Sequence, residues 1–85
     1  MQAERQAPIS VTLTKEGALY VNKQPVTLRH LGAVLKRHPN LHADTGVLLF
    51  ADREVEYQQL FEVLDRIRKA GLHRISLQAE SRGAP

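Results

Sequence analysis

The chain has 85 residues, of which 42% are hydrophobic and 25% charged, and its formal net charge is +3. A chain of this length forms one small domain with a thin core, and the positive charge bears on association with anionic partners rather than on the fold. The absence of cysteine excludes disulfides and thiolate metal sites, and no run approaches the ~20 apolar residues that span a bilayer.

The N-terminal part of the chain predicts a lead-in followed by strands. Residues Met1–Pro8 are polar and lack an apolar period, so we expect a mobile lead-in. Apolar and polar residues alternate over Ile9–Thr14, which predicts a half-buried strand, and the Lys15–Gly17 turn leads into a return strand at Ala18–Val21. The chain turns again at Asn22–Pro25, and because proline lacks a backbone donor, a short strand here belongs at a sheet edge.

A first helix and a buried strand are predicted next. Thr27 can cap the helix through its hydroxyl, and Pro39 ends it no later than about His38, because the residue before a proline avoids the helical region. Apolar residues recur at helical spacing on one face: Leu28, Leu31, Val34 and Leu35. After a polar loop at Asn40–Gly46, the apolar run Val47–Ala51 is typical of a strand that is covered on both faces or central in the sheet.

The second helix is the clearest element of the sequence. One apolar stripe runs along it: Tyr57, Leu60, Phe61, Leu64 and Ile67. Glu62 and Arg66 have the i,i+4 spacing of a weak surface ion pair, and Gly71 is expected just past the end of the helix. Ile75–Gln78 alternates and predicts a final strand, whereas Glu80–Pro85 has nothing to pack against.

These elements predict the α+β class. The expected order is β-β-(β)-α-β-α-β, a two-layer sandwich with two helices packed on one face of a small mixed sheet of about four to five strands. A right-handed crossover makes the strands at Val47–Ala51 and Ile75–Gln78 parallel neighbours. No internal repeat or linker is visible, so we expect a lead-in at residues 1–8, one domain at residues 9–79 and a flexible tail at residues 80–85.

The sequence indicates neither a metal site nor a nucleic-acid surface. His38 and His42 have the spacing of a ligand pair, but Pro39 breaks the helix that would place both on one face. The four aromatic residues are too few for a base-stacking platform, and the five glycines are isolated rather than gathered in a phosphate-binding loop. We therefore expect no cofactor, no metal and no nucleic-acid partner.

Asp52 is the strongest candidate for chemistry, because it follows a buried strand, where ligands and catalytic groups gather in α/β folds. With Glu54 and Glu56 it forms an acidic cluster suited to acid–base work or to a divalent cation. The simpler interpretation is that Asp52 accepts hydrogen bonds from turn amides and that the glutamates favour the helix N-terminus. No serine elbow, partner histidine or paired-metal spacing completes a catalytic set, so a binding module fits the sequence better than an enzyme.

Several short segments match the pattern of one known family. They are Val11–Leu13 with the Gly17 turn, Leu19–Asn22 with Pro25-Val26, Ala51-Asp52 with Val55 and Tyr57, Asp65, Ala70-Gly71 and Ile75–Leu77. In these segments the chain resembles the periplasmic domain of the ExbD/TolR family, along Pro8–Glu80. Three of these segments are more similar in sequence to ExbD than to TolR: Ala51-Asp52, Val55-Glu56-Tyr57 and Val63-Leu64-Asp65.

The resemblance implies a longer inner-membrane protein, whose transmembrane helix precedes Met1, carries the proton-handling aspartate and lies beside an ExbB pore subunit. It implies a periplasmic homodimer that contacts the periplasmic part of TonB. The proton motive force would then energise outer-membrane uptake of siderophores and cobalamin. TolR-like members form the alternative: they work in the Tol-Pal system with TolQ and TolA, and some are associated with binding peptidoglycan.

A sheet edge is the expected place of partner contact, because an unpaired row of backbone groups can accept a strand from another chain. The first choice is Ile9–Leu13, as an edge that exchanges between protomers or accepts a TonB-like strand, and the second is Ile75–Gln78. A merely tolerated exposed edge explains the same pattern. The residues predicted to bind a partner are Ile9, Ser10, Val11, Thr12, Leu13, Ile75, Ser76, Leu77 and Gln78.

Overall fold

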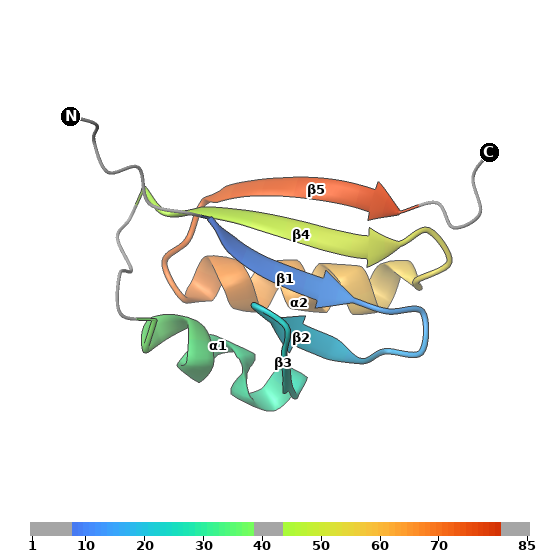
Figure 1. The fold of residues 1–85 in the computed structure, drawn as a ribbon, viewed down its shortest axis with the longest axis horizontal. Coiled ribbons are helices and arrows are strands. Elements are labelled where there is room, and N and C mark those ends of the chain that lie inside the picture. The colour runs from blue at the N-terminus through green and yellow to red at the C-terminus, as the bar shows by residue number, and fades with distance from the viewer. Residues whose placement is uncertain (1–7, 39–43, 81–85) are drawn as a thin grey trace.

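A computed structural model of the protein describes residues 8–38 and 44–80. In chain order the elements are β1 (Ile9–Leu13), β2 (Leu19–Val21), β3 (Gln24–Val26), α1 (Leu28–Lys36), β4 (Gly46–Asp52), α2 (Tyr57–Lys69) and β5 (Arg74–Glu80). The five strands form one sheet, and α1 and α2 lie together behind it (Figure 1). This arrangement confirms the predicted α+β fold with two helices on a mixed sheet.

The strand order across the sheet is β3-β2-β1-β4-β5. β1, β2 and β3 pair antiparallel, whereas β1 pairs in parallel with β4, and β4 in parallel with β5, as predicted for the last two. The two parallel connections, one through β2, β3 and α1 and the other through α2, advance in the same direction across the sheet. Right-handed crossovers that advance in one direction place their helices on the same face, which explains why α1 and α2 share one layer.

The central position of β1 corrects the sequence-based prediction that Ile9–Leu13 is an edge strand. Val11 pairs with Val21 of β2 on one side and with Leu49 of β4 on the other, so β1 has a neighbouring strand at both of its sides. The physical reason is the long crossover after β3, which returns the chain to the free side of β1. Alternation of apolar and polar residues shows that one face of a strand is covered, and it is the same for an edge strand and a central one.

The hydrophobic core lies between the sheet and the two helices. Its fully buried side chains come from both layers: Ile9, Val11, Val47, Leu49, Leu31, Leu35, Val63, Ile67 and Leu72. β4 is central, as predicted, but burial alternates along it, and Leu48 and Phe50 are only half-buried. These two side chains lie on the sheet face opposite the helices.

Local sequence signals begin and end the elements as predicted. The Thr27 hydroxyl accepts a hydrogen bond from the backbone N–H of His30 at 3.3 Å and so caps α1. α2 is followed by Gly71 at φ +94°, the left-handed conformation that commonly terminates helices. Between β2 and β3, Asn22 and Lys23 both have positive φ, which is the two-residue turn that matches the twist of antiparallel strands.

The face that α2 buries differs from the predicted stripe. Val63 is 2% exposed and Ile67 is fully buried, whereas Tyr57 and Phe61 are 76% and 62% exposed. Because a helix completes a turn in about 3.6 residues, Val63 and Ile67 share the core-facing side with Leu60, and the two aromatic residues lie on the flank. The prediction that Tyr57 and Phe61 belong to the buried stripe is therefore wrong.

Arg66 connects the two helices instead of pairing with Glu62. Its Nη1 donates a hydrogen bond to the carbonyl oxygen of Leu28 at 3.2 Å, so the predicted Glu62–Arg66 ion pair is replaced by a contact with α1. The i,i+4 ion pair on α2 joins Lys69 Nζ to Asp65 Oδ2 at 3.2 Å. Both of those side chains are more than half exposed, so this pair adds little stability.

Two neighbouring leucines of β4 test the one-sided core. We expect Leu49→Ala to lower the free energy of unfolding by about 2–5 kcal/mol, because it removes a fully buried side chain and leaves a cavity. Leu48→Ala is the matched control and should cost clearly less, since Leu48 is half-buried on the opposite face. Urea unfolding followed by far-UV circular dichroism measures both changes. Equal losses at the two positions would contradict a core confined to the helix side.

Candidate functional site

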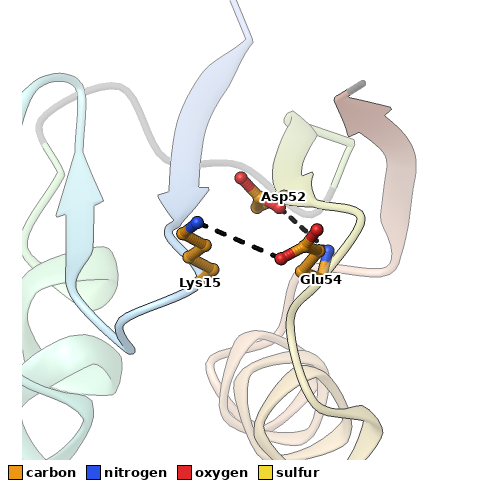
Figure 2. Close-up of polar contacts among 3 residues, drawn as sticks. All are labelled: Lys15, Asp52 and Glu54. Carbon is orange, nitrogen blue, oxygen red and sulfur yellow. Dashed lines mark hydrogen bonds and ion pairs between the residues drawn. The ribbon is translucent and has the colours of Figure 1, made fainter. Parts of the chain in front are cut away.

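A polar cluster lies where the parallel strands β1 and β4 end (Figure 2). Lys15 follows β1, Asp52 is the last residue of β4, and Glu54 comes shortly after it. Lys15 Nζ lies 4.0 Å from Glu54 Oε1, and both side chains are more than half exposed. An open hollow of about 290 Å³, lined in part by Thr12 and Phe50, adjoins the cluster. The cluster thus occupies the position at which α/β folds usually bind ligands.

Asp52 stabilises the turn that joins β4 to α2. Its Oδ1 accepts a hydrogen bond from the backbone N–H of Glu54 at 2.8 Å, and its carbonyl oxygen accepts one from the backbone N–H of Val55 at 3.0 Å. The turn role predicted for this carboxylate is therefore confirmed. Glu56 occupies the N-cap position of α2 without a side-chain capping hydrogen bond. The contacts of the cluster are thus those of a turn and of a weak surface ion pair. The cluster does not bring a nucleophile next to an activating base.

The histidines are dispersed among the residues that the structure describes. His30 Nδ1 lies 2.9 Å from Thr27 Oγ1, and His38 Nε2 lies 3.5 Å from Asn22 Nδ2. Within the described part of the chain, no three histidine, aspartate or glutamate side chains lie close enough together to hold a metal ion. His42, the second member of the ligand-like pair in the sequence, lies outside the described residues.

The sheet ends in two unlike edge strands, β3 and β5. β3 has three residues and contains Pro25, which has no backbone donor, so the predicted edge position of this proline is confirmed. β5 has seven residues without a proline, and within the described sheet it pairs with β4 alone. Of the two strands predicted to contact a partner, Ile75–Gln78 thus lies at an edge, and Ile9–Leu13 lies inside the sheet with β4 between them.

The two faces of β5 have different chemistry. Ile75 pairs in register with Val47 and Leu77 with Leu49, so both apolar side chains face the helix layer. Ser76 and Gln78 face the opposite side, where Gln78 Nε2 donates a hydrogen bond to Ser76 Oγ at 3.0 Å. The strand at the free edge is therefore amphipathic. A segment that pairs with its backbone would have apolar neighbours on one face of the sheet and polar neighbours on the other.

Two further exposed residues, Tyr57 and Phe61, were not predicted as part of a surface. Their ring centroids are 6.1 Å apart with an interplanar angle of 20°, so the rings stack on the flank of α2. One sequence signal could have identified them. When Val63 is counted with the predicted stripe, the apolar arc of α2 becomes wider than one buried face requires, so some of its members must be exposed.

Comparison with known proteins places these features in a family context. The family model described as biopolymer transport protein ExbD/TolR matches residues 1–82. The chain is 25% identical over 79 residues to the biopolymer transport protein ExbD of Escherichia coli (strain K12), covering 93% of the chain and 56% of that protein. It is 31% identical over 67 residues to a Synechocystis protein that is also named biopolymer transport protein ExbD, and the match covers 79% of the chain and 25% of that protein. The chain thus spans about half of one relative and a quarter of the other.

A helix that crosses a membrane needs about 20 predominantly apolar residues. Neither α1 nor α2, the helices of the described residues, is long and apolar enough to do so. Their exposed polar faces are those of helices that cover one side of a sheet.

Substitutions at Asp52 and Lys15 test the turn interpretation of the polar cluster. We expect Asp52→Ala to lower the free energy of unfolding by about 1 kcal/mol, because the Glu54 amide loses its acceptor. Asp52→Asn keeps an acceptor oxygen and should restore most of the loss. Lys15→Ala should change the free energy by less than about 0.5 kcal/mol, since its ion pair is exposed. Thermal and urea unfolding give these values, and a larger loss for Lys15→Ala than for Asp52→Ala would contradict the assignment.

Proposed function

The chain belongs to the ExbD/TolR family of biopolymer transport proteins, and from this premise we propose that it is the periplasmic domain of an ExbD-like subunit. In this proposal a transmembrane helix outside the present chain anchors the subunit in the inner membrane beside an ExbB-like pore. The proton motive force drives the assembly, and two copies of the domain contact a TonB-like protein. The work supports outer-membrane uptake of siderophores or cobalamin. The ExbD names of both relatives support the ExbD-like assignment over a TolR-like one.

The open edge of β5 is the observation that carries the proposal. It is the longer of the two edges, it contains no proline, and its backbone pairs with β4 alone within the described sheet. Strand addition at such an edge gives affinity through main-chain hydrogen bonds and needs no catalytic group. We therefore assign the contact with a TonB-like segment to Ile75–Gln78, the second of the two strands predicted from the sequence.

Transmission of force by contact, rather than catalysis, also agrees with the polar groups of the domain. Asp52 is used by a turn, and Lys15 and Glu54 form an exposed ion pair at 4.0 Å. A domain that transmits force needs a rigid sheet with a reversible docking edge. The parallel pairing of β5 with the central strand β4 supplies a direct path from that edge into the core.

Amide chemical-shift mapping tests the docking edge. The full chain, labelled with ¹⁵N, is titrated with a peptide from the periplasmic part of a TonB protein. We expect the largest shift changes along Ile75–Gln78, because new backbone hydrogen bonds form there. β3 provides an internal control: it is also an edge strand, but it is short and contains Pro25, so its amides should not respond.

A second titration with soluble muropeptides separates the two branches of the family. A response to muropeptides without any response to the TonB peptide would overturn the ExbD-like proposal in favour of a TolR-like role at the cell wall. Changes confined to the exposed sides of α1 and α2, with β5 silent, would overturn the assignment of the docking edge.

A further inference from the structure

The charges of the chain are unevenly distributed between its two helices. None of the nine acidic residues of the chain lies within residues 17–43, the stretch that contains α1. The same stretch contains four basic residues: Lys23, Arg29, Lys36 and Arg37. On α2, by contrast, Glu62 and Asp65 are interspersed with basic residues. One helix therefore has charges of both signs, and the other has positive charge alone.

The outward side of α1 carries three of these basic residues. Leu31 and Leu35 are fully buried in the core, so the opposite side of the helix faces solvent. Because a helix completes a turn in about 3.6 residues, Arg29 and Lys36 lie two turns apart on that outward side, and Arg37 lies next to Lys36. All three basic residues are exposed, as this geometry requires.

The turn between β2 and β3 adds a fourth basic residue near the end of α1. Asn22 Nδ2, in this turn, lies 3.5 Å from Nε2 of His38, which follows the helix. The exposed Lys23 is next to Asn22 and therefore lies close to the C-terminal end of α1. Within the described part of the chain, none of the four basic side chains forms an ion pair. We call these four residues the basic face of α1: Lys23, Arg29, Lys36 and Arg37.

The stability of the helix does not account for the whole of this face. Lys36 and Arg37 lie at the C-terminal end of α1, where positive charge suits the helix dipole. Arg29, however, lies in the first turn, where the dipole opposes a cation and where no acidic residue compensates it. Unpaired charges of one sign repel each other, and a partner of opposite charge removes that repulsion. An anionic surface is therefore the partner chemistry that the basic face fits.

We propose that the basic face of α1 binds anionic lipid headgroups on the periplasmic surface of the inner membrane. The four cations are spread along a helix and a neighbouring turn instead of surrounding one point, which suits a plane of negative charges. Each lysine or arginine near such a surface strengthens binding roughly five-fold, so the four together give a substantial attraction. This inference rests on the proposed function in one respect: the anchor assumed there holds the domain beside the membrane at a high effective concentration.

Contact through α1 leaves the other end of the sheet free. α1 contacts β3, whereas β5 lies at the opposite end of the strand order (Figure 1). The membrane surface can therefore hold the domain through α1 while the edge of β5 stays accessible.

Vesicle binding tests the basic face. The full chain is mixed with vesicles of equal parts phosphatidylglycerol and phosphatidylcholine, or of phosphatidylcholine alone, and sedimentation gives the partition coefficient at low and at physiological ionic strength. The test variant combines Arg29→Gln with Lys36→Gln. The matched control combines Arg68→Gln with Lys69→Gln, because it removes one arginine and one lysine from exposed positions of the other helix and leaves the same net charge. A nitroxide-labelled lipid in nanodiscs then identifies the amides that lie nearest to the lipid surface.

We expect the parent chain to bind the anionic vesicles, to leave the neutral ones unbound and to lose affinity as salt is added. The test variant should bind about 10- to 30-fold more weakly, because two cations leave the contact, and the control should stay close to the parent. The nitroxide should broaden the amide signals of α1 more than those of α2 and β5. Glutamine has a helix propensity similar to those of lysine and arginine, so both variants should retain the amide dispersion of the native fold.

The inference has three distinct ways to fail. Equal losses in the two double variants would show that net charge alone drives the binding and would remove the role of α1. No binding of the parent chain to anionic vesicles at low salt would remove the membrane surface as the partner. An oligoglutamate peptide that shifts the α1 amides, with the vesicles unbound, would reassign the face to an acidic segment of a protein. None of these results involves β5, so they are distinguishable from a failure of the TonB peptide to perturb that strand, which would overturn the proposed docking edge.

Discussion

The parallel pairing of β1 with β4 is the constraint on which the rest of the domain depends. Once the chain returns from α1 to the free side of β1, that strand becomes central, the two crossovers share a direction, and both helices must lie on one face. The pairing joins residues that are far apart in the sequence, so forming it costs loop-closure entropy. Burial of Ile9, Val11, Val47 and Leu49 at the junction offsets that cost. The edge position of β5 follows from the same step.

Most of the local structure could be predicted because its causes are local. The Thr27 cap and the Gly71 stop each depend on a few neighbouring residues, and the structure places both where the sequence indicated. The three errors concern long-range arrangement, and one of them is the Glu62–Arg66 ion pair, which is replaced because Arg66 reaches a carbonyl of α1. The alternation in Ile9–Leu13 reports that one face is covered and carries no information about how many strands lie alongside. Helical spacing likewise identified the apolar residues of α2, but which part of a wide apolar arc turns inward is decided by the position of the sheet.

The proposed docking edge on β5 was also predictable in part from the sequence. Ile75–Gln78 was identified as a strand from its alternation, and its edge position follows from the topology rather than from the residues themselves. Tyr57 and Phe61 were assigned to the apolar stripe because they share helical spacing with Leu60, Leu64 and Ile67. Family membership and geometry therefore direct attention to contact surfaces rather than to the polar cluster at Asp52.

The inequality of the two edges has a consequence for the size of any assembly built through the sheet. β3 is short and its Pro25 interrupts the row of donors, so this edge is a poor template, whereas β5 is long and uninterrupted. A domain with two good templates could stack repeatedly into an open-ended fibre. When two such domains pair through β5, the outer edges of the combined sheet are both β3 strands, which are poor templates for further pairing. The fold thereby limits the stoichiometry of edge pairing and protects the protein against runaway polymerisation.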